Sequence, residues 1–344
     1  MNIKKIILTI IAIVLIVGAL IGYKFYGKIY GSNVKEDTAV YIPTDASFDE
    51  IKEIIEPVVD NIDSFVWVAN KKNYPNVIKA GKYVIEKGMS NNALIDLLRS
   101  GKQTPLTLTF NNQDTLEKLA GRIAAQIEPD SVQVLNALTD KEFLSKNNFN
   151  KASALGIFIP NSYEFYWNTS AESFRDRMLK EYNRFWNEDR IAKAKKLNMS
   201  KNDVTTLASI VQKETANVNE RPTVAGLYLN RLKDGWALQA DPTVIFALKQ
   251  KHGQDYEVKR VLNADLLIDS PYNTYKNTGL PPAPIAMPDI SSIDAVLNSE
   301  KHEYYYMCAN IEDMRSHKFA RTLAQHNANA REYQQWLNKQ GVNR

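Results

Sequence analysis

An uncharged run near the N-terminus, residues 6–22, constrains the fold of this chain more than any other feature. Its one polar side chain is Thr9, and as a helix it would be about 26 Å long, close to the thickness of a membrane's hydrocarbon layer. Two lysines precede the run and two follow it, so charge does not settle its orientation. The exit sequence GALIGYKFYG has no A-x-A cleavage site. We therefore predict a single transmembrane anchor rather than a cleaved signal peptide.

The net charge of +4 is a property of this N-terminal region. Lys4, Lys5, Lys24 and Lys28 are its only charged residues, and elsewhere 39 Lys and Arg balance 39 Asp and Glu. No basic tract is left that would bind nucleic acid. The single cysteine, Cys308, excludes an internal disulfide and a Cys-based zinc site. It lies in the apolar run YYYMCA, where we expect a buried strand.

The length of 344 residues allows two or three domains, and the patterns predict three segments. These are the anchor and its flanks (1–31), a linker and small αβ module (32–104, the linker at 32–40), and a larger mixed domain (105–344). In the module we expect strands at 41–43, 64–70 and 80–85 and helices at 51–61 and 91–100. In the larger domain we expect strands at 105–110, 304–309 and 317–319 and helical segments at 114–127, 131–147, 203–217, 222–235 and 322–339. We expect one long helix or a pair of helices at 171–198. The predicted fold class is α+β.

One predicted helix carries a carboxylate on its apolar face. Val204, Leu207, Val211, Glu214 and Val218 are spaced three and four residues apart, so they share one side of a helix. Loss of water raises the pKa of a carboxyl group, and an acid that is still protonated near neutral pH can donate its proton to a leaving oxygen. The alternative is a structural ion pair with a buried Arg or Lys.

Cleavage of a glycosidic bond is one reaction that such an acid could perform. Ordinary hydrolases need a second carboxylate. Glu220 is about 240° around the helix from Glu214 and shares its face only if the helix breaks, whereas Asp241 could converge only through tertiary folding. Asp241 could equally cap a helix that starts at Pro242. A mechanism with one carboxylate is the simpler interpretation.

Other chemistries have little support in the sequence. The four histidines, His252, His302, His317 and His326, show no metal-ligand spacing. There is no nucleophile elbow for a catalytic serine, no dinucleotide-binding glycine motif and no P-loop. We predict neither a metal nor a cofactor.

Several motifs together resemble the endolytic murein transglycosylases, the YceG-like family. They follow in the family's order: ASIVQKET (208–215), NERP (219–222), AGLYLNRL (225–232), LQADPT (238–243), YNTY (272–275) and GLPP (279–282). The resemblance covers about residues 38–340, and it implies a membrane anchor, a LysM-like module and a YceG-like catalytic domain.

The resemblance also implies the site. Family members cut nascent peptidoglycan glycan strands internally, between N-acetylmuramic acid and N-acetylglucosamine, and leave 1,6-anhydro ends. Their catalytic glutamate corresponds to Glu214, and the residues that line or shape the cleft correspond to Gln239, Asp241, Thr243, Asn273 and Tyr275. His317 and Phe319 match the family's H-x-F stretch without an assigned role. Leu155 and Asn161-Ser162 depart from the family pattern.

Three hypotheses follow from the sequence. The first is a lytic transglycosylase in the cytoplasmic membrane, with its catalytic domain outside the cytoplasm, acting beside peptidoglycan synthases. The second is a non-catalytic scaffold that binds glycan and recruits synthases. The third is a hydrolase that uses Glu214 with Asp241 and leaves reducing ends.

Overall fold

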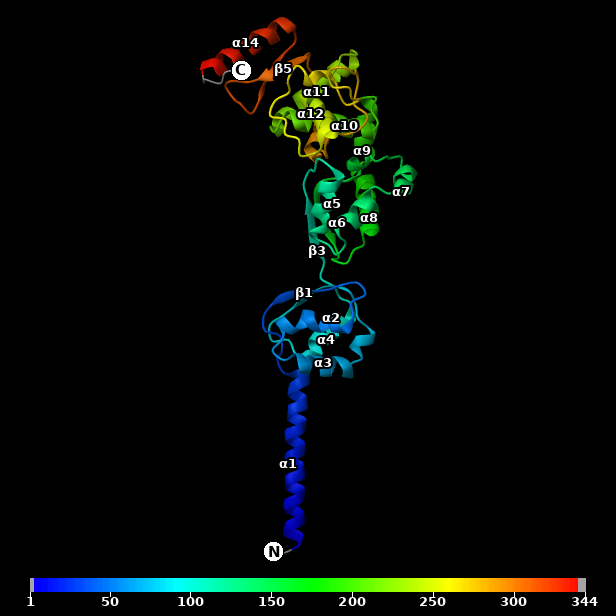
Figure 1. The fold of residues 1–344 in the computed structure, drawn as a ribbon, viewed down its shortest axis with the longest axis vertical. Coiled ribbons are helices and arrows are strands. Elements are labelled where there is room, and N and C mark those ends of the chain that lie inside the picture. The colour runs from blue at the N-terminus through cyan, green and yellow to red at the C-terminus, as the bar shows by residue number, and fades with distance from the viewer. Residues whose placement is uncertain (1–2, 340–344) are drawn as a thin grey trace. The chain divides into compact units, whose positions relative to one another are not determined.

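The computed structural model describes residues 3–339, and it divides into two compact units. Unit 1 comprises Met1–Leu108, Ala125–Pro129 and Tyr163–Ser170, and unit 2 comprises Thr109–Ala124, Asp130–Ser162 and Ala171–Arg344. The described chain is mixed α+β, as predicted (Figure 1). Its three two-stranded sheets pair β1 (Thr38–Ile42) with β2 (Gly81–Ile85), β3 (Leu106–Phe110) with β4 (Asn161–Phe165), and β5 (Tyr306–Ala309) with β6 (His317–Ala320). The α+β class is thus confirmed, while the boundaries of the three predicted segments stay predictions.

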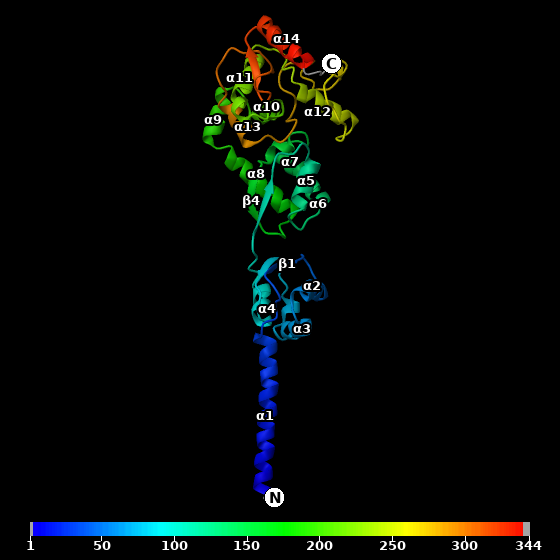
Figure 2. The same ribbon diagram turned by 90° about the vertical axis from the view of Figure 1, so that its left-hand side faces the viewer.

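The N-terminal run lies in one continuous helix, α1 (Ile3–Tyr30; Figures 1 and 2). It is the one helix among the described residues that is long and apolar enough to cross a membrane, with a mean hydropathy of 2.9. None of its residues is buried, so it is not the core helix of a folded domain. A single-pass anchor is consistent with this helix, although a signal sequence shares its length and composition.

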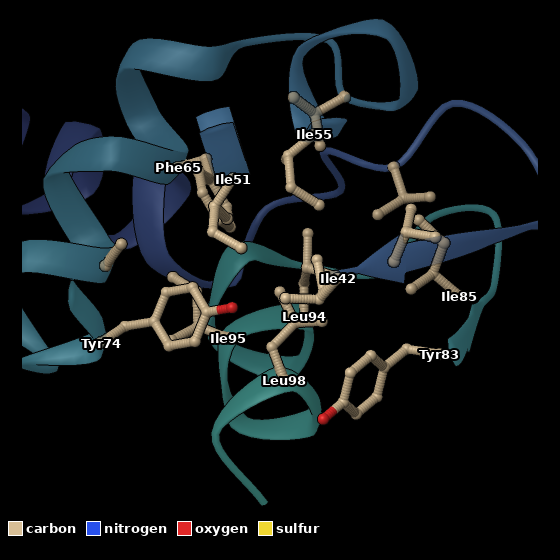
Figure 3. Packing of buried hydrophobic residues seen from close by; sticks show 14 of the residues in the cluster. Ile42, Ile51, Ile55, Phe65, Tyr74, Tyr83, Ile85, Leu94, Ile95 and Leu98 are labelled. Carbon is tan, nitrogen blue, oxygen red and sulfur yellow. The ribbon is translucent and has the colours of Figure 1, made fainter. Parts of the chain in front are cut away.

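Beyond α1, unit 1 contains a small αβ module. Strands β1 (Thr38–Ile42) and β2 (Gly81–Ile85) pair antiparallel, with Val40 opposite Tyr83. Helices α2 (Phe48–Ile55), α3 (Ile62–Lys71) and α4 (Asn91–Ser100) supply the rest of the core. Figure 3 shows their side chains converging, among them Ile51, Phe65 and Leu94. Its kinship with LysM modules stays a prediction.

Two expectations for this module were wrong. Residues 64–70 were expected to form a strand because of their β-branched and aromatic side chains, but they lie in α3. Asn61 caps that helix by accepting a 2.8 Å hydrogen bond from the Ser64 N–H, and its buried positions recur at helical spacing. The linker at 32–40 is likewise partly core, since Val34 is only 2% exposed and the Asn33 amide bonds the buried Asn91.

In unit 2, helices surround the central helix α10 (Lys201–Glu214), which is buried along most of its length and packs against α11, α12 and α13. Strands β5 (Tyr306–Ala309) and β6 (His317–Ala320) pair antiparallel, and Cys308 in β5, expected in a buried strand, is only partly buried. The segment 131–147, expected to be helical, forms two helices, and α13 was not predicted. The remaining elements of the two units are β3 (Leu106–Phe110), β4 (Asn161–Phe165), α5 (Leu116–Ala124), α6 (Ser131–Leu138), α7 (Lys141–Lys146), α8 (Ala171–Phe185), α9 (Glu188–Lys196), α11 (Arg221–Lys233), α12 (Asp241–His252), α13 (Ile290–Leu297) and α14 (Leu323–Lys339).

Candidate active site

Glu214 is the last residue of α10. A capping box opens this helix, in which the Ser200 hydroxyl accepts from the Asp203 N–H and the Asp203 carboxylate accepts from the Ser200 N–H. Val204, Leu207 and Val211 are fully buried, as the apolar stripe predicted. The helix stops three residues earlier than expected, because Thr215 has extended backbone angles (φ −137°, ψ 132°). Val218 therefore leaves the stripe and is 51% exposed.

Glu214 is partly buried, and among the described residues its carboxyl group accepts one hydrogen bond. Tyr228 on α11 donates from its hydroxyl to Glu214 Oε1 at 2.8 Å, and Tyr228 is itself only 1% exposed. Burial raises the pKa of Glu214 to about 7, although the Tyr228 hydrogen bond and the charges of His317 and Arg231 oppose the rise. A substantial share of Glu214 is thus protonated at neutral pH.

Asp241 lies close enough to Glu214 for its negative charge to raise the Glu214 pKa further. It is the first residue of α12, and Ala240 is the N-cap with no side-chain bond, so Asp241 does not cap the helix. The Tyr275 hydroxyl instead donates to Asp241 Oδ1 at 2.5 Å. Burial and these carboxylates raise the pKa of Tyr275, which keeps the phenol protonated. Asp241 and Tyr275 therefore belong to the same cluster as Glu214.

The other three residues predicted for the cleft hold the loops around it. Thr243 is fully buried and its hydroxyl bonds Ala240 O at 2.7 Å. Asn273 is also fully buried, and its amide donates to Leu266 O and Ile268 O. Gln239 has a left-handed backbone (φ 50°), and its N–H donates to Thr274 O while its side chain is exposed. Substrate contact by these three residues stays a prediction, and their placement supports a shaping role.

The apolar stripe alone does not indicate two residues of the site on α11, Tyr228 and Arg231. They are three residues apart and so face the same side of the helix. The Arg231 guanidinium is buried and donates to Tyr305 O at 2.8 Å and to Leu238 O. Both residues lie in the AGLYLNRL motif, and a polar pair at helical spacing within an apolar motif was the available signal.

Glu220, which is buried, and His317, which is partly buried, form a pair whose imidazole acts electrostatically on Glu214. The helix break that the sequence left open does occur, and it places Glu220 at the end of the 3-10 turn η4 (Val218–Glu220). Its carboxylate accepts from the His317 N–H at 2.6 Å and lies 2.7 Å from His317 Nδ1. Desolvation opposes both charges, but these bonds prevail, so the pKa of Glu220 is lowered and the pKa of His317 is raised.

The described residues contain no group of three or more His, Cys, Asp and Glu side chains that could hold a metal ion. A hollow of about 1080 Å³ in unit 2 is lined by residues such as Leu197, Asn230 and Lys301, and none of the partners of Glu214 lines it. By its volume alone, this hollow would be a candidate binding site. We place the candidate site at Glu214 because a carboxyl group with a raised pKa and several convergent polar groups is the stronger chemical signal.

The chain belongs to the YceG-like family, whose model matches residues 40–332. A Bacillus subtilis (strain 168) protein named endolytic murein transglycosylase is 32% identical over 334 residues, covering 91% of this chain and 90% of the relative. A Streptococcus pneumoniae (serotype 2, strain D39) protein of the same name is 29% identical, covering 88% of this chain and 59% of the relative. A crystal structure of a yceG-like protein from Listeria monocytogenes matches with a TM-score of 0.58 at 31% identity, covering 85% of this chain and 98% of that one.

Proposed function

We propose that this protein is a lytic transglycosylase that cuts peptidoglycan glycan strands internally, between N-acetylmuramic acid and N-acetylglucosamine. The observation that carries the proposal is Glu214, a partly buried carboxyl group whose pKa is raised to about 7. Family membership supports the proposal, because the relatives named above are called endolytic murein transglycosylases. Glu214 corresponds to the catalytic glutamate of the family motif.

The proposed reaction uses one carboxyl group twice. Protonated Glu214 donates its proton to the bridging oxygen, and the bond from that oxygen to C1 of the muramic residue breaks through an oxocarbenium-like state. The C6 hydroxyl of the same sugar then attacks C1, and the Glu214 carboxylate takes the hydroxyl proton. The product has a 1,6-anhydro end, and Glu214 is protonated again. A pKa near the working pH suits both halves of this cycle.

A hydrolase is the second candidate, because Asp241 lies within electrostatic reach of Glu214. In that mechanism Asp241 would activate a water or attack C1, and the products would carry reducing ends. One oxygen of Asp241 already accepts the Tyr275 hydroxyl, which suits a residue that orients the cleft rather than one that reacts. A scaffold that binds glycan without cutting it is the third candidate, and the raised pKa of Glu214 argues against it.

Replacement of Glu214 by Gln tests the proposal. The amide keeps the shape of the side chain but cannot donate a proton to the leaving oxygen, so we expect fragment release from uncrosslinked glycan strands to fall by at least about 100-fold. The matched control is Glu172→Gln, an exposed position in α8 that should leave the rate unchanged. A Glu214→Gln protein as active as the control would exclude Glu214 as the acid.

We further propose that α1 anchors the protein in the cytoplasmic membrane once, with residues 32–344 outside the cytoplasm, where they act in cell-wall synthesis beside peptidoglycan synthases. The apolar α1 and the location of peptidoglycan support this topology. Protease added to cells with an opened wall but a sealed membrane should digest the region after α1. Full protection of that region would contradict the topology.

A further inference from the structure

The carboxylate of Glu220 holds His317 with both of its oxygens. Oε2 accepts the backbone N–H of His317 at 2.6 Å, and Oε1 lies 2.7 Å from the ring atom Nδ1. The two residues are 97 positions apart in the sequence, and Glu220 is only 8% exposed. A bond to the backbone fixes the start of β6, and a bond to the ring fixes the imidazole itself.

Thr215 connects the candidate acid to the turn that carries Glu220. Thr215 directly follows Glu214, it is buried, and its hydroxyl oxygen accepts a hydrogen bond from the Asn217 N–H at 3.0 Å. The Thr215 backbone N–H donates to Val211 O at 3.2 Å, so the end of α10 is fixed as well. These bonds fix the short segment that leads from Glu214 to Glu220, and the Glu220 carboxylate holds the imidazole of His317. Glu214 and His317 lie close enough for the charge of each to act on the other.

The geometry also sets which ring nitrogen of His317 carries a proton. An ionised carboxylate only accepts hydrogen bonds, so Nδ1 must be the donor to Glu220. Among the described residues no hydrogen-bond partner of Nε2 is found, so this nitrogen can take up a second proton. A second proton on Nε2 makes an imidazolium whose charge Glu220 and Glu214 both stabilise.

We propose that His317, held by Glu220, is a positioning residue that places a positive charge beside Glu214 and thereby sets the upper pH limit of cleavage. This inference rests on the proposed function and deepens it, since it assigns a role to a second pair of residues at the same site. His317 acts through Glu214 and does not itself touch the bond that breaks.

Charged groups from each neighbouring element enter the argument. Tyr228 hydrogen-bonds Glu214 from α11, and the charges of Arg231 on α11, Asp241 on α12 and His317 on β6 act on it. The charge of Glu214 in turn raises the pKa of Tyr275, in the loop before α13. His317 in turn is faced by Glu220 and Glu214. Two cations, the Arg231 guanidinium and the His317 imidazolium, favour the ionised form of Glu214. Only the imidazolium can lose its charge between pH 5 and 8.

The sign of the effect follows directly. An imidazolium favours the ionised form of Glu214, so its removal raises the pH at which Glu214 loses its proton. Because cleavage needs protonated Glu214, the alkaline limb of kcat/KM moves to higher pH in His317→Gln. The glutamine amide can still donate to Glu220, which preserves the hydrogen bond without the charge. Glu220→Gln moves the limb in the same direction, since the imidazole then loses its stabilising carboxylate.

The experiment measures kcat/KM for glycan cleavage by the full-length protein in detergent between pH 5 and 9. We expect both variants to shift the alkaline limb upward by about half a pH unit or more. His252→Gln, an exposed histidine at the end of α12, is the matched control and should not shift it. An alkaline limb that stays in place in His317→Gln, with activity merely reduced, would overturn the inference and leave His317 a structural residue.

A second measurement does not depend on activity. Histidine NMR of the full-length protein follows the titration of His317, assigned as the signal that disappears in His317→Gln. We expect its pKa to fall in Glu214→Gln and to fall further in Glu220→Gln, because each substitution removes a stabilising charge. A His317 pKa that is the same in Glu214→Gln as in the wild type would overturn the coupling. If the wild type cuts no glycan, the proposed function fails while this titration still decides the coupling.

Discussion

At the residue scale, the site is organised around a carboxyl group that the fold partly shields from solvent. Glu214 is at the C-terminal end of α10, where the partial negative charge of the helix also disfavours a carboxylate. Burial is the main cause of its raised pKa, and the hydrogen bond from Tyr228 only partly offsets it. The protein therefore holds a carboxyl group in an environment that favours its protonated form, which is the form the reaction needs first.

This environment has a consequence for stability that does not depend on catalysis. The folded state binds the proton of Glu214 more tightly than the unfolded state, whose carboxyl group has the ordinary pKa of 4.5. The stabilising effect of protonation is thus present in full below pH 4.5 and is lost as the pH rises through about 7. A pKa difference of this size corresponds to a penalty of up to about 3 kcal/mol at high pH.

We therefore expect Glu214→Gln to be more stable than the wild type at pH 8 and of similar stability at pH 4.5. The neutral amide avoids the burial of a charge, and its oxygen can still accept the hydrogen bond from the Tyr228 hydroxyl. Thermal unfolding of both proteins at the two pH values is the measurement. A variant that is less stable than the wild type at pH 8 would mean that the charge of Glu214 is well compensated and that its pKa is not raised.

The sequence predicted Glu214 because the residues before it follow a strict helical period in a buried stripe. It could not predict Tyr228 or Arg231, because a contact between two helices depends on how they cross. Asn273 and Thr243 illustrate a different limit. Their place in family motifs marks them as important, but only the fold shows that both are fully buried and bond backbone atoms.

At the element scale, α11 connects the acid to the rest of unit 2. One side of it brings Tyr228 to Glu214. Another side is joined to the segment that leads into β5, where Asn230 donates to His302 O and Tyr304 O. The close packing of α11 against this segment requires a glycine at position 226, since a Cβ there would lie 2.3 Å from the backbone oxygen of Glu300. The position of the Tyr228 hydroxyl thus depends on a residue that has no side chain.

Two glycine substitutions within unit 2 should have opposite effects. Gly226→Ala forces α11 away from the backbone at Glu300, and we expect a loss of about 1–3 kcal/mol in stability together with reduced cleavage. Gly121→Ala in α5 adds a methyl group with no atom within 4 Å, and we expect a gain of about 0.5–1 kcal/mol. Thermal unfolding measures both. Equal melting temperatures for the two variants would contradict the close packing of α11 against the backbone at Glu300.

Element prediction succeeded where local signals agreed with one another. Ser90 caps α4 and Ser200 caps α10, both helices that the pattern predicted, and Gly101 ends α4 with a left-handed backbone (φ 70°). It failed at 64–70, where side chains typical of strands follow an asparagine cap and take up a helical period. Intrinsic preference was outweighed there by packing in the core.

At the scale of the whole molecule, the apolar helix is continuous with the fold of unit 1. Asn91 donates to Lys28 O at the end of α1, and it also bonds Ser64 and Asn33. Phe25 of α1 stacks on Trp67 of α3 at 5.2 Å between ring centroids. The sequence predicted an anchor and a linker as separate pieces. It could not show that the residues after the anchor are core, because Asn33 and Val34 carry no pattern that separates them from a polar connection.

The mass of the cleavage products tests the central claim most directly. Full-length protein would be incubated with long uncrosslinked glycan strands, and the released fragments would be weighed by mass spectrometry beside those of a known hydrolase. If Glu214 both donates and accepts the proton, each fragment should have a 1,6-anhydro end and be lighter by one water molecule than the corresponding hydrolytic fragment. Fragments of hydrolytic mass would contradict this account, and Asp241→Asn would then be the variant expected to abolish them.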